Sequence, residues 1–149
     1  MKVNEPIRAL SWKEPYASLM LHGKIETRTW GTKYRGLVLI CSSKKAYTHE
    51  QVYNISGGLV TDFIRKVIGR NYDHWQNNII KQGYAIAMGR LVDCRPMKKK
   101  DEDKCFVRYN SNLWCHIYED VRAINPFPWK GSQGWKILTE EQISKIELK

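Results

Sequence analysis

The apolar run LVLICSS (37–43) constrains the fold most, because a short continuous apolar stretch of this kind predicts a buried strand. The segment before it, GTKYRG (31–36), has a glycine at each end and is typical of a turn. Two further segments, IRALSW (7–12) and YAIAMGRLVDC (84–94), also have strand character. The chain is therefore expected to build a sheet from strands that lie far apart in the sequence.

The middle of the chain, residues 48–81, has a different pattern, with apolar side chains at helical spacing. Thr48 and Gln51 have the spacing of a capping box, in which each side chain binds the backbone of the other residue. The pair Gly57-Gly58 separates two helical pieces. This stretch is predicted to be a helical insertion between strands.

The remaining segments complete the predicted order of elements. We expect a helix in YASLMLHG (16–23), a solvated hairpin loop in MKKKDEDK (97–104), strands in FVRY (106–109), LWCHIYEDVRAI (113–124) and WKIL (135–138), and a terminal helix in TEEQISKI (139–146). Strands at both ends around a helical middle predict an α+β fold with a mixed, partly closed sheet. No repeat or linker divides the chain, so residues 1–149 are expected to form one domain.

The charge of the chain points to a polyanionic partner. The 25 lysines and arginines exceed the 15 aspartates and glutamates, giving a net charge of +10. Such a surplus attracts phosphate backbones, which favours RNA, another nucleic acid or a nucleotide-like ligand. A soluble protein that is basic without binding any of these is the alternative.

Other classes of function have little support in the sequence. The four cysteines form no CxxC pair and the four histidines have no metal-ligand spacing, so no metal and no cofactor is expected. No P-loop or GxGxxG motif is present. We expect a reduced, cytoplasmic protein without a signal peptide or a membrane span, and a monomer.

The segment HGKIETRTW (22–30) is the first candidate site, because Lys24, Glu26, Arg28 and Trp30 occupy every second position. On an extended chain these four side chains share one face, and Thr27 points to the other. Two cations beside a carboxylate keep that carboxylate ionised. The row is compatible with an exposed strand laced with ion pairs, the commoner arrangement for such spacing, or with the wall of a pocket.

The segment PFPWKGSQGW (126–135) is the second candidate site. Trp129 offers a surface for stacking, Lys130 a charge and Gln133 an amide that is suited to the edge of a base. Trp135 lies in the apolar segment WKIL and is expected in the core, whereas Trp129 fits either role. Arg35, just before the buried strand, is a candidate phosphate contact or a solvated turn residue.

Three segments in this order resemble the ASCH domain family, a group of PUA-like proteins. The first contains Pro15, Gly23, Lys24, Glu26, Arg28, Trp30, Arg35 and Gly36 at the family's positions. GYAIAMGRLVDC (83–94) is similar to the family's central strand, and INPFPWKGSQGWKIL (124–138) is similar to its closing segment. Two features differ from most members, since Gly23 and Glu26 are closer together and Glu14 stands where glutamine is commoner.

The resemblance implies a small, mixed PUA-like β-barrel decorated by helices. It also implies a cleft lined by the strand of Lys24, Glu26 and Arg28, and a role in binding RNA. Some small members hydrolyse N4-acetylcytidine through a lysine and a threonine in this strand, and others have been described as nucleases. In the hydrolysing type a threonine stands where this chain has Glu26.

Two main hypotheses follow, with a weaker third. The first is an RNA-binding module with a cleft for a base or nucleotide. Its predicted nucleic-acid-binding residues are Lys24, Glu26, Arg28, Trp30, Arg35, Trp129, Lys130 and Gln133. The second is a hydrolase, either an N4-acetylcytidine amidohydrolase or a metal-independent ribonuclease, with Lys24 and Glu26 as catalytic residues. The third is an adaptor whose basic surface only tethers it to RNA-bound partners.

Overall fold

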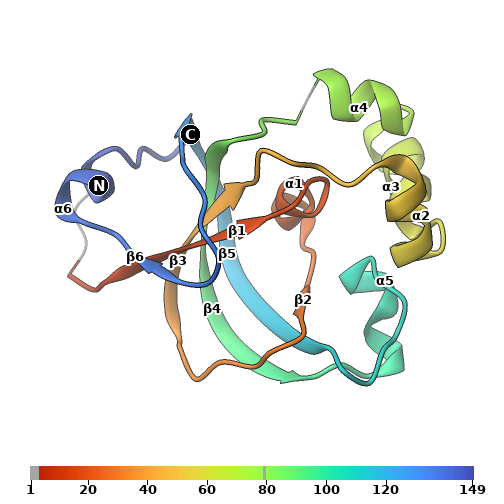
Figure 1. Ribbon diagram of the computed structural model, residues 1–149, viewed down its shortest axis with the longest axis horizontal. Coiled ribbons are helices and arrows are strands. Elements are labelled where there is room, and N and C mark those ends of the chain that lie inside the picture. Colours follow the sequence, from red (N-terminus) through yellow and green to blue (C-terminus); the bar gives the residue numbers. More distant parts are fainter. Residues whose placement is uncertain (1–3, 79) are drawn as a thin grey trace.

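The computed structural model describes residues 4–78 and 80–149, and its framework is one curled, six-stranded sheet (Figure 1). The strands are β1 (Ile7–Trp12), β2 (Glu26–Arg28), β3 (Gly36–Ser42), β4 (Tyr84–Pro96), β5 (Trp114–Pro128) and β6 (Lys136–Ile137). Their order across the sheet is β2-β5-β4-β3-β1-β6, with β1 and β3 parallel and the other neighbours antiparallel. The predicted α+β class and mixed, partly closed sheet are confirmed as a curled half-barrel.

Short helices surround this sheet. They are α1 (Tyr16–Leu19), η1 (Met20–His22), α2 (His49–Ser56), α3 (Leu59–Phe63), η2 (Ile64–Ile68), α4 (Tyr72–Asn78), η3 (Lys99–Asp101), α5 (Glu102–Cys105) and α6 (Glu140–Ser144). In Figure 1, α2, α3 and α4 lie together on one side of the sheet, and α6 lies near the opposite end of the molecule. Within residues 4–78 and 80–149, no helix combines the length and apolar character needed to cross a membrane.

The helical insertion is confirmed for the residues described. The capping box of Thr48 and Gln51 is present at the start of α2, with both of its hydrogen bonds formed. Gly57 and Gly58 both have positive φ, at 65° and 94°, which lets the chain turn between α2 and α3. Ile79 falls in the stretch predicted to be helical and lies outside the described residues.

The sheet is covered on both faces, which explains why β3 has a continuous apolar sequence. Val38 and Ile40 belong to the larger core, under the helical insertion. Leu39 and Cys41 point to the other face and join a second core that includes Ile146, just after α6. A strand buried on both faces needs apolar residues at successive positions, so the prediction of a buried strand here is confirmed.

Two predictions for the segment after β4 are wrong. The predicted solvated loop at 97–104 forms η3 and α5, because the carboxylate of Asp101 turns inward. It pairs with both terminal nitrogens of Arg95 at 2.8 and 2.9 Å and accepts the Lys98 N–H at 2.8 Å. The predicted strand at 106–109 is absent from these described residues. Phe106 ends α5 with a φ of 56°, and the Arg108 N–H then donates to the Ile55 carbonyl in α2 instead of to a strand.

The closing segment also differs from expectation. β5 continues through NPFP to Pro128, beyond the predicted end of the strand at residue 124. Trp129 is buried in the second core, packed edge to face against Phe127, whereas Trp135 is only partly buried. The short strand β6 inside the segment 135–138 is confirmed. Of the two roles open to Trp129, the structure shows the core role, because the extension of β5 carries it inward. Trp135 packs against the edge of the larger core.

Glu14 is a buried carboxyl group between β1 and α1. Its side chain is fully buried and accepts hydrogen bonds from the Ser18 backbone N–H at 2.9 Å and the Ser18 hydroxyl at 3.0 Å. Burial raises the pKa of Glu14 above its ordinary value of 4.5, because these hydrogen bonds only partly replace lost hydration. The native state therefore holds this proton more tightly than the unfolded chain does.

Glu14→Gln is expected to stabilise the protein at pH 8. Between pH 4.5 and the higher pKa of the native state, the native protein binds a proton that the unfolded chain has released, so stability falls as pH rises. Glutamine removes this penalty, with an expected gain on the order of 1 kcal/mol, or about 3 °C in Tm. Thermal unfolding at pH 4 and pH 8 measures it. The gain should vanish at pH 4. The control Glu119→Gln, at an exposed position, should leave Tm nearly unchanged at both pH values. A loss of stability at pH 8 would contradict this account.

Candidate functional site

The local fold around β2 turns the predicted row of charges inward. The helix η1 ends at Gly23, whose φ of 81° reverses the chain. The Ile25 N–H then donates to the Lys104 carbonyl of α5 at 2.9 Å, and β2 pairs with β5 so that Glu26 lies opposite His116. Only 3% of Lys24 and 5% of Glu26 remain exposed. The geometry therefore agrees with a pocket wall and not with an exposed strand.

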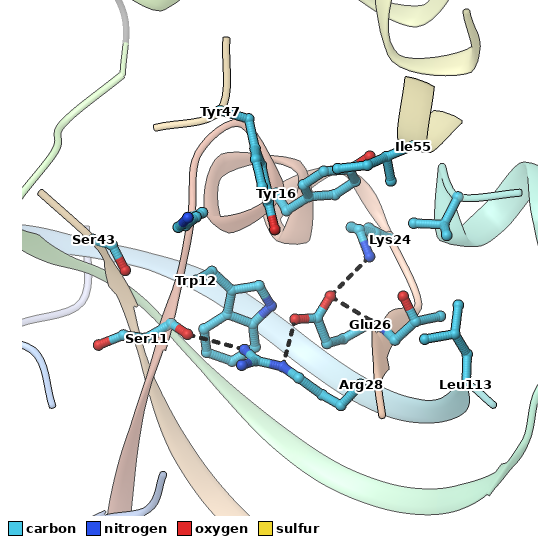
Figure 2. A pocket seen from close by; sticks show the side chains of 13 residues that line it. Ser11, Trp12, Tyr16, Lys24, Glu26, Arg28, Ser43, Tyr47, Ile55 and Leu113 are labelled. Carbon is cyan, nitrogen blue, oxygen red and sulfur yellow. Dashed lines mark hydrogen bonds and ion pairs between the residues drawn. The ribbon is translucent and has the colours of Figure 1, made fainter. Parts of the chain in front are cut away.

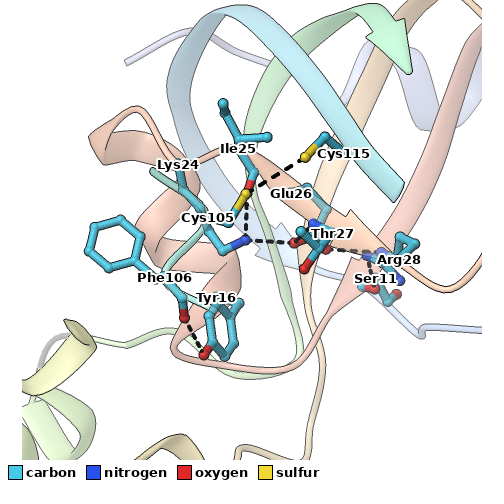
Figure 3. A network of polar contacts seen from close by, with 10 residues as sticks. All are labelled: Ser11, Tyr16, Lys24, Ile25, Glu26, Thr27, Arg28, Cys105, Phe106 and Cys115. Carbon is cyan, nitrogen blue, oxygen red and sulfur yellow. Dashed lines mark hydrogen bonds and ion pairs between the residues drawn. The ribbon is translucent and has the colours of Figure 1, made fainter. Parts of the chain in front are cut away.

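Glu26 is the centre of a buried charge cluster (Figure 3). Its Oε1 lies 2.9 Å from Lys24 Nζ and accepts the Thr27 backbone N–H at 3.1 Å. Its Oε2 lies 2.9 Å from Arg28 Nε. Burial acts to raise the pKa of Glu26, but the charges of Lys24 and Arg28, with hydrogen bonds from Lys24 and the Thr27 N–H, outweigh burial and hold the pKa below its ordinary value. The carboxylate is therefore fixed as an anion that accepts hydrogen bonds.

The ammonium group of Lys24 is fully engaged with its surroundings. It donates to the Ile25 carbonyl at 2.9 Å and to Glu26 at the same distance. It also lies 5.0 Å from the ring centroid of Tyr16, a cation–π contact. The side chain of Lys24 is completely buried. These contacts make Lys24 a fixed partner of Glu26.

The curl of the sheet closes a hollow between β2 and β1, although β5, β4 and β3 lie between these strands in the sheet. Arg28 spans the gap, since its Nη2 donates to the Ser11 carbonyl at 3.0 Å and its Cζ lies 4.9 Å from the ring centroid of Trp12. The hollow has a volume of about 480 Å³. Figure 2 shows the charge cluster below Tyr16 and Tyr47, with Trp12 beside it.

Aromatic rings and cations together define the chemistry of this first hollow. Trp12, Tyr16 and Tyr47 supply ring surface, and Lys13 adds a cation at the rim. The indole N–H of Trp12 is buried and has no hydrogen-bond partner within the described residues. A buried unpaired donor is costly, and a ligand or a water molecule with an acceptor would satisfy it. The volume is in the range of small-molecule sites.

A second hollow, of about 430 Å³, adjoins the first and shares Ser11, Arg28 and Ser43 with it. Its other lining residues are Leu10, Trp30, Ser132, Gln133 and Gly134. His116 holds Trp30 in place, because its Nε2 lies 2.8 Å from the Trp30 carbonyl and the two rings pack edge to face. Two predicted site residues, Trp30 and Gln133, thus border this second hollow together with Arg28.

The other predicted site residues lie elsewhere. Arg35 borders a third hollow with Trp114, and its guanidinium lies 3.9 Å from the Asp93 carboxylate. Lys130 is exposed and belongs to none of the three hollows. Trp129 is a core residue, with the Lys136 ammonium 5.5 Å from its ring centroid. The structure therefore places Lys24, Glu26, Arg28, Trp30 and Gln133 around the two adjoining hollows. Arg35, Lys130 and Trp129 lie away from both.

Sequence reasoning missed the aromatic wall of the first hollow. Trp12 ends an apolar strand and is indistinguishable in sequence from a core residue, and Tyr47 immediately precedes a helix. Thr27 was predicted to point away from Lys24, yet it also borders the hollow. The charged neighbour Lys13 is the one signal that β1 ends near polar surroundings.

Comparison with known proteins assigns no relative. No protein-family model matches the chain, and a search of curated proteins finds no significant match. Within residues 4–78 and 80–149, no group of three or more histidine, cysteine, aspartate or glutamate side chains is arranged to hold a metal ion.

Glu26→Ala is expected to lower the free energy of unfolding by about 3–5 kcal/mol. The substitution leaves the buried ammonium of Lys24 and the guanidinium of Arg28 without their counter-charge. Urea denaturation measures the loss. Asp62→Ala is the control, because it breaks an exposed ion pair with Arg65 and should cost less than about 1 kcal/mol. Equal losses for the two variants would show that the cluster is not held by the buried carboxylate.

Proposed function

We propose that this protein binds RNA and accommodates one base in the first hollow. The observation that carries the proposal is the combination, in one cavity of about 480 Å³, of three aromatic side chains with the buried cluster of Lys24, Glu26 and Arg28. Aromatic rings hold nucleic acid bases by stacking, whatever the base, because every base has a flat π surface. Fixed polar groups beside those rings then contact the base edge.

The polar groups of the hollow are complementary to a base edge. Oε1 of Glu26 already accepts two hydrogen bonds, whereas Oε2 faces one cation and retains capacity for an amino or imino donor. The free indole N–H of Trp12 is a donor for a ring nitrogen or carbonyl oxygen of the base. Anion and donor are preorganised, because their positions depend on buried contacts and not on solvent-exposed side chains.

Charge supports a polyanion as the partner. The first hollow has three cations, Lys13, Lys24 and Arg28, against the single carboxylate of Glu26. The whole chain has a net charge of +10. The resemblance of three segments to the ASCH family favours RNA over other polyanions, and the curled sheet is compatible with the PUA-like type that this resemblance implies. These points together support RNA binding in preference to an adaptor role.

The hydrolase remains a second candidate, because Lys24 and Thr27 both border the first hollow. The contacts of Lys24 count against it. A nucleophilic lysine needs a neutral amine with a free lone pair, and this ammonium is bound by a carboxylate, a carbonyl and an aromatic ring. A binding role for the site agrees better with this geometry.

Tyr47→Leu is expected to weaken binding of single-stranded RNA by roughly 5- to 150-fold in Kd, the cost of one lost base–aromatic stack. Leucine keeps apolar volume at the rim but removes the ring. Fluorescence polarisation with a labelled oligonucleotide of mixed sequence measures Kd over a salt series, and the affinity should fall as salt rises. Tyr53→Leu, at a 54% exposed position outside the hollows, should leave Kd unchanged. A salt-independent Kd, or equal effects of the two variants, would contradict the proposal.

The binding interpretation also predicts no Lys24-dependent turnover of N4-acetylcytidine or of labelled RNA. Release of acetate and shortening of the RNA would be followed for the wild type and for Lys24→Ala, with chelator present to exclude metals. Both proteins should give the background rate. Turnover by the wild type that Lys24→Ala abolishes would favour the hydrolase instead.

A further inference from the structure

The two adjoining hollows differ in chemistry. The first is walled by the rings of Trp12, Tyr16 and Tyr47. The second is bordered mainly by hydroxyl groups, an amide, a guanidinium and a glycine, with Leu10 and Trp30 as its apolar members. One ligand that filled both would have a flat aromatic part and a polar part joined to it, which is the constitution of a nucleotide.

Arg28 stands at the junction and has donors to spare. Its Nε faces Glu26 Oε2 and its Nη2 donates to the Ser11 carbonyl, so the guanidinium is held by both strands. The N–H groups on Nη1 have no partner within the described part of the chain. About a fifth of the side chain, 21%, remains exposed. A fixed, partly exposed guanidinium is the preferred protein partner of a phosphate group.

The loop after β5 faces Arg28 across the second hollow. Gly131 approaches β1 so closely that a Cβ on it would lie 2.8 Å from Ser11 Oγ. Gly134 has a φ of 73° and turns the chain toward β6. Between these two glycines, the backbone N–H groups find no acceptor within residues 4–78 and 80–149. Successive free N–H groups together with a serine hydroxyl are suited to the oxygens of a phosphate.

We propose that one nucleotide occupies both hollows, with its base in the first and its phosphate in the second between Arg28 and the loop Gly131–Gly134. The site therefore selects phosphorylated nucleotides, free or within a strand, over nucleosides. This inference rests on the proposed function, because it takes the base to lie in the first hollow. It adds the phosphate as a required part of the ligand and assigns the loop after β5 to its recognition.

Competition with labelled single-stranded RNA tests the phosphate requirement. The competitors are the four common ribonucleosides and their 3′- and 5′-monophosphates, each titrated against the wild-type complex. One of the two phosphate series is expected to compete at least about tenfold better than the matching nucleosides, in line with the 1.5–3 kcal/mol of a hydrogen bond to a charged group. Whether the 3′- or the 5′-monophosphates compete better also indicates in which direction the RNA strand runs through the site.

Variants of the loop separate this inference from the proposed function. The double variant Ser132→Ala/Gln133→Ala removes the loop's hydroxyl and amide groups but keeps Arg28 and the backbone N–H groups. It should therefore reduce the preference for phosphate without abolishing it, and leave nucleoside competition unchanged. Ser111→Ala/Gln82→Ala removes an exposed serine and an exposed glutamine away from both hollows and should keep the wild-type preference.

Three results would overturn the inference while RNA binding that depends on Tyr47 still stood. They are equal competition by nucleosides and their phosphates, no competition by either, and an unchanged preference in the loop variant. A wild type that binds no RNA at all would remove the proposed function as well.

Discussion

The buried carboxylate of Glu26 is the constraint on which the site depends. A carboxylate that is 5% exposed is stable as an anion only beside fixed cations, and Lys24 and Arg28 provide them from the same short segment. Arg28 in turn reaches the Ser11 carbonyl of β1, so the charge cluster links two strands that are not neighbours in the sheet. The curl of the sheet brings β2 opposite β1, and the hydrogen bond from Arg28 to Ser11 connects the two strands across the hollow.

The two faces of the sheet differ in what covers them. On one face, β1, β3 and β4 contribute to a core completed by Trp129 and by residues around α6. On the other face the core is larger, and it ends at the hollow where Trp12 is both a packed side chain and a wall of the cavity. Polar groups accumulate where that core meets the edge strand β2. A ligand bound there would contact rigid elements, which limits the entropy lost on binding.

The sequence predicted the parts of the fold that depend on local pattern. The run 37–43, the capping box at Thr48 and the alternation of Lys24, Glu26 and Arg28 all follow from spacing alone, and each is present. The failures required knowledge of contacts that local spacing does not specify. Asp101 lies in a highly charged stretch that predicts solvent exposure, but its pairing with Arg95 and with the Lys98 N–H turns it inward.

The candidate site was predictable to the same extent. Strand alternation is a local property and placed Lys24, Glu26 and Arg28 on one face, but it left open whether that face was exposed or lined a pocket. Trp12 and Tyr47 were not predicted as site residues, because they reach the wall through the curl of the sheet and the path of the chain before α2. Trp129 could not be distinguished from a binding residue until β5 was seen to extend through Pro128.

The indole N–H of Trp12 offers the most direct test of a base in the first hollow. The chain has six tryptophans, whose indole N–H signals can be followed in a two-dimensional ¹H–¹⁵N spectrum, and Trp12→Phe would assign the relevant one. Adding single-stranded RNA should shift the Trp12 signal in proportion to the bound fraction, because the N–H gains an acceptor. The signal of Trp75, buried within the helical insertion, should not move. RNA binding that leaves the Trp12 signal unchanged would contradict the account.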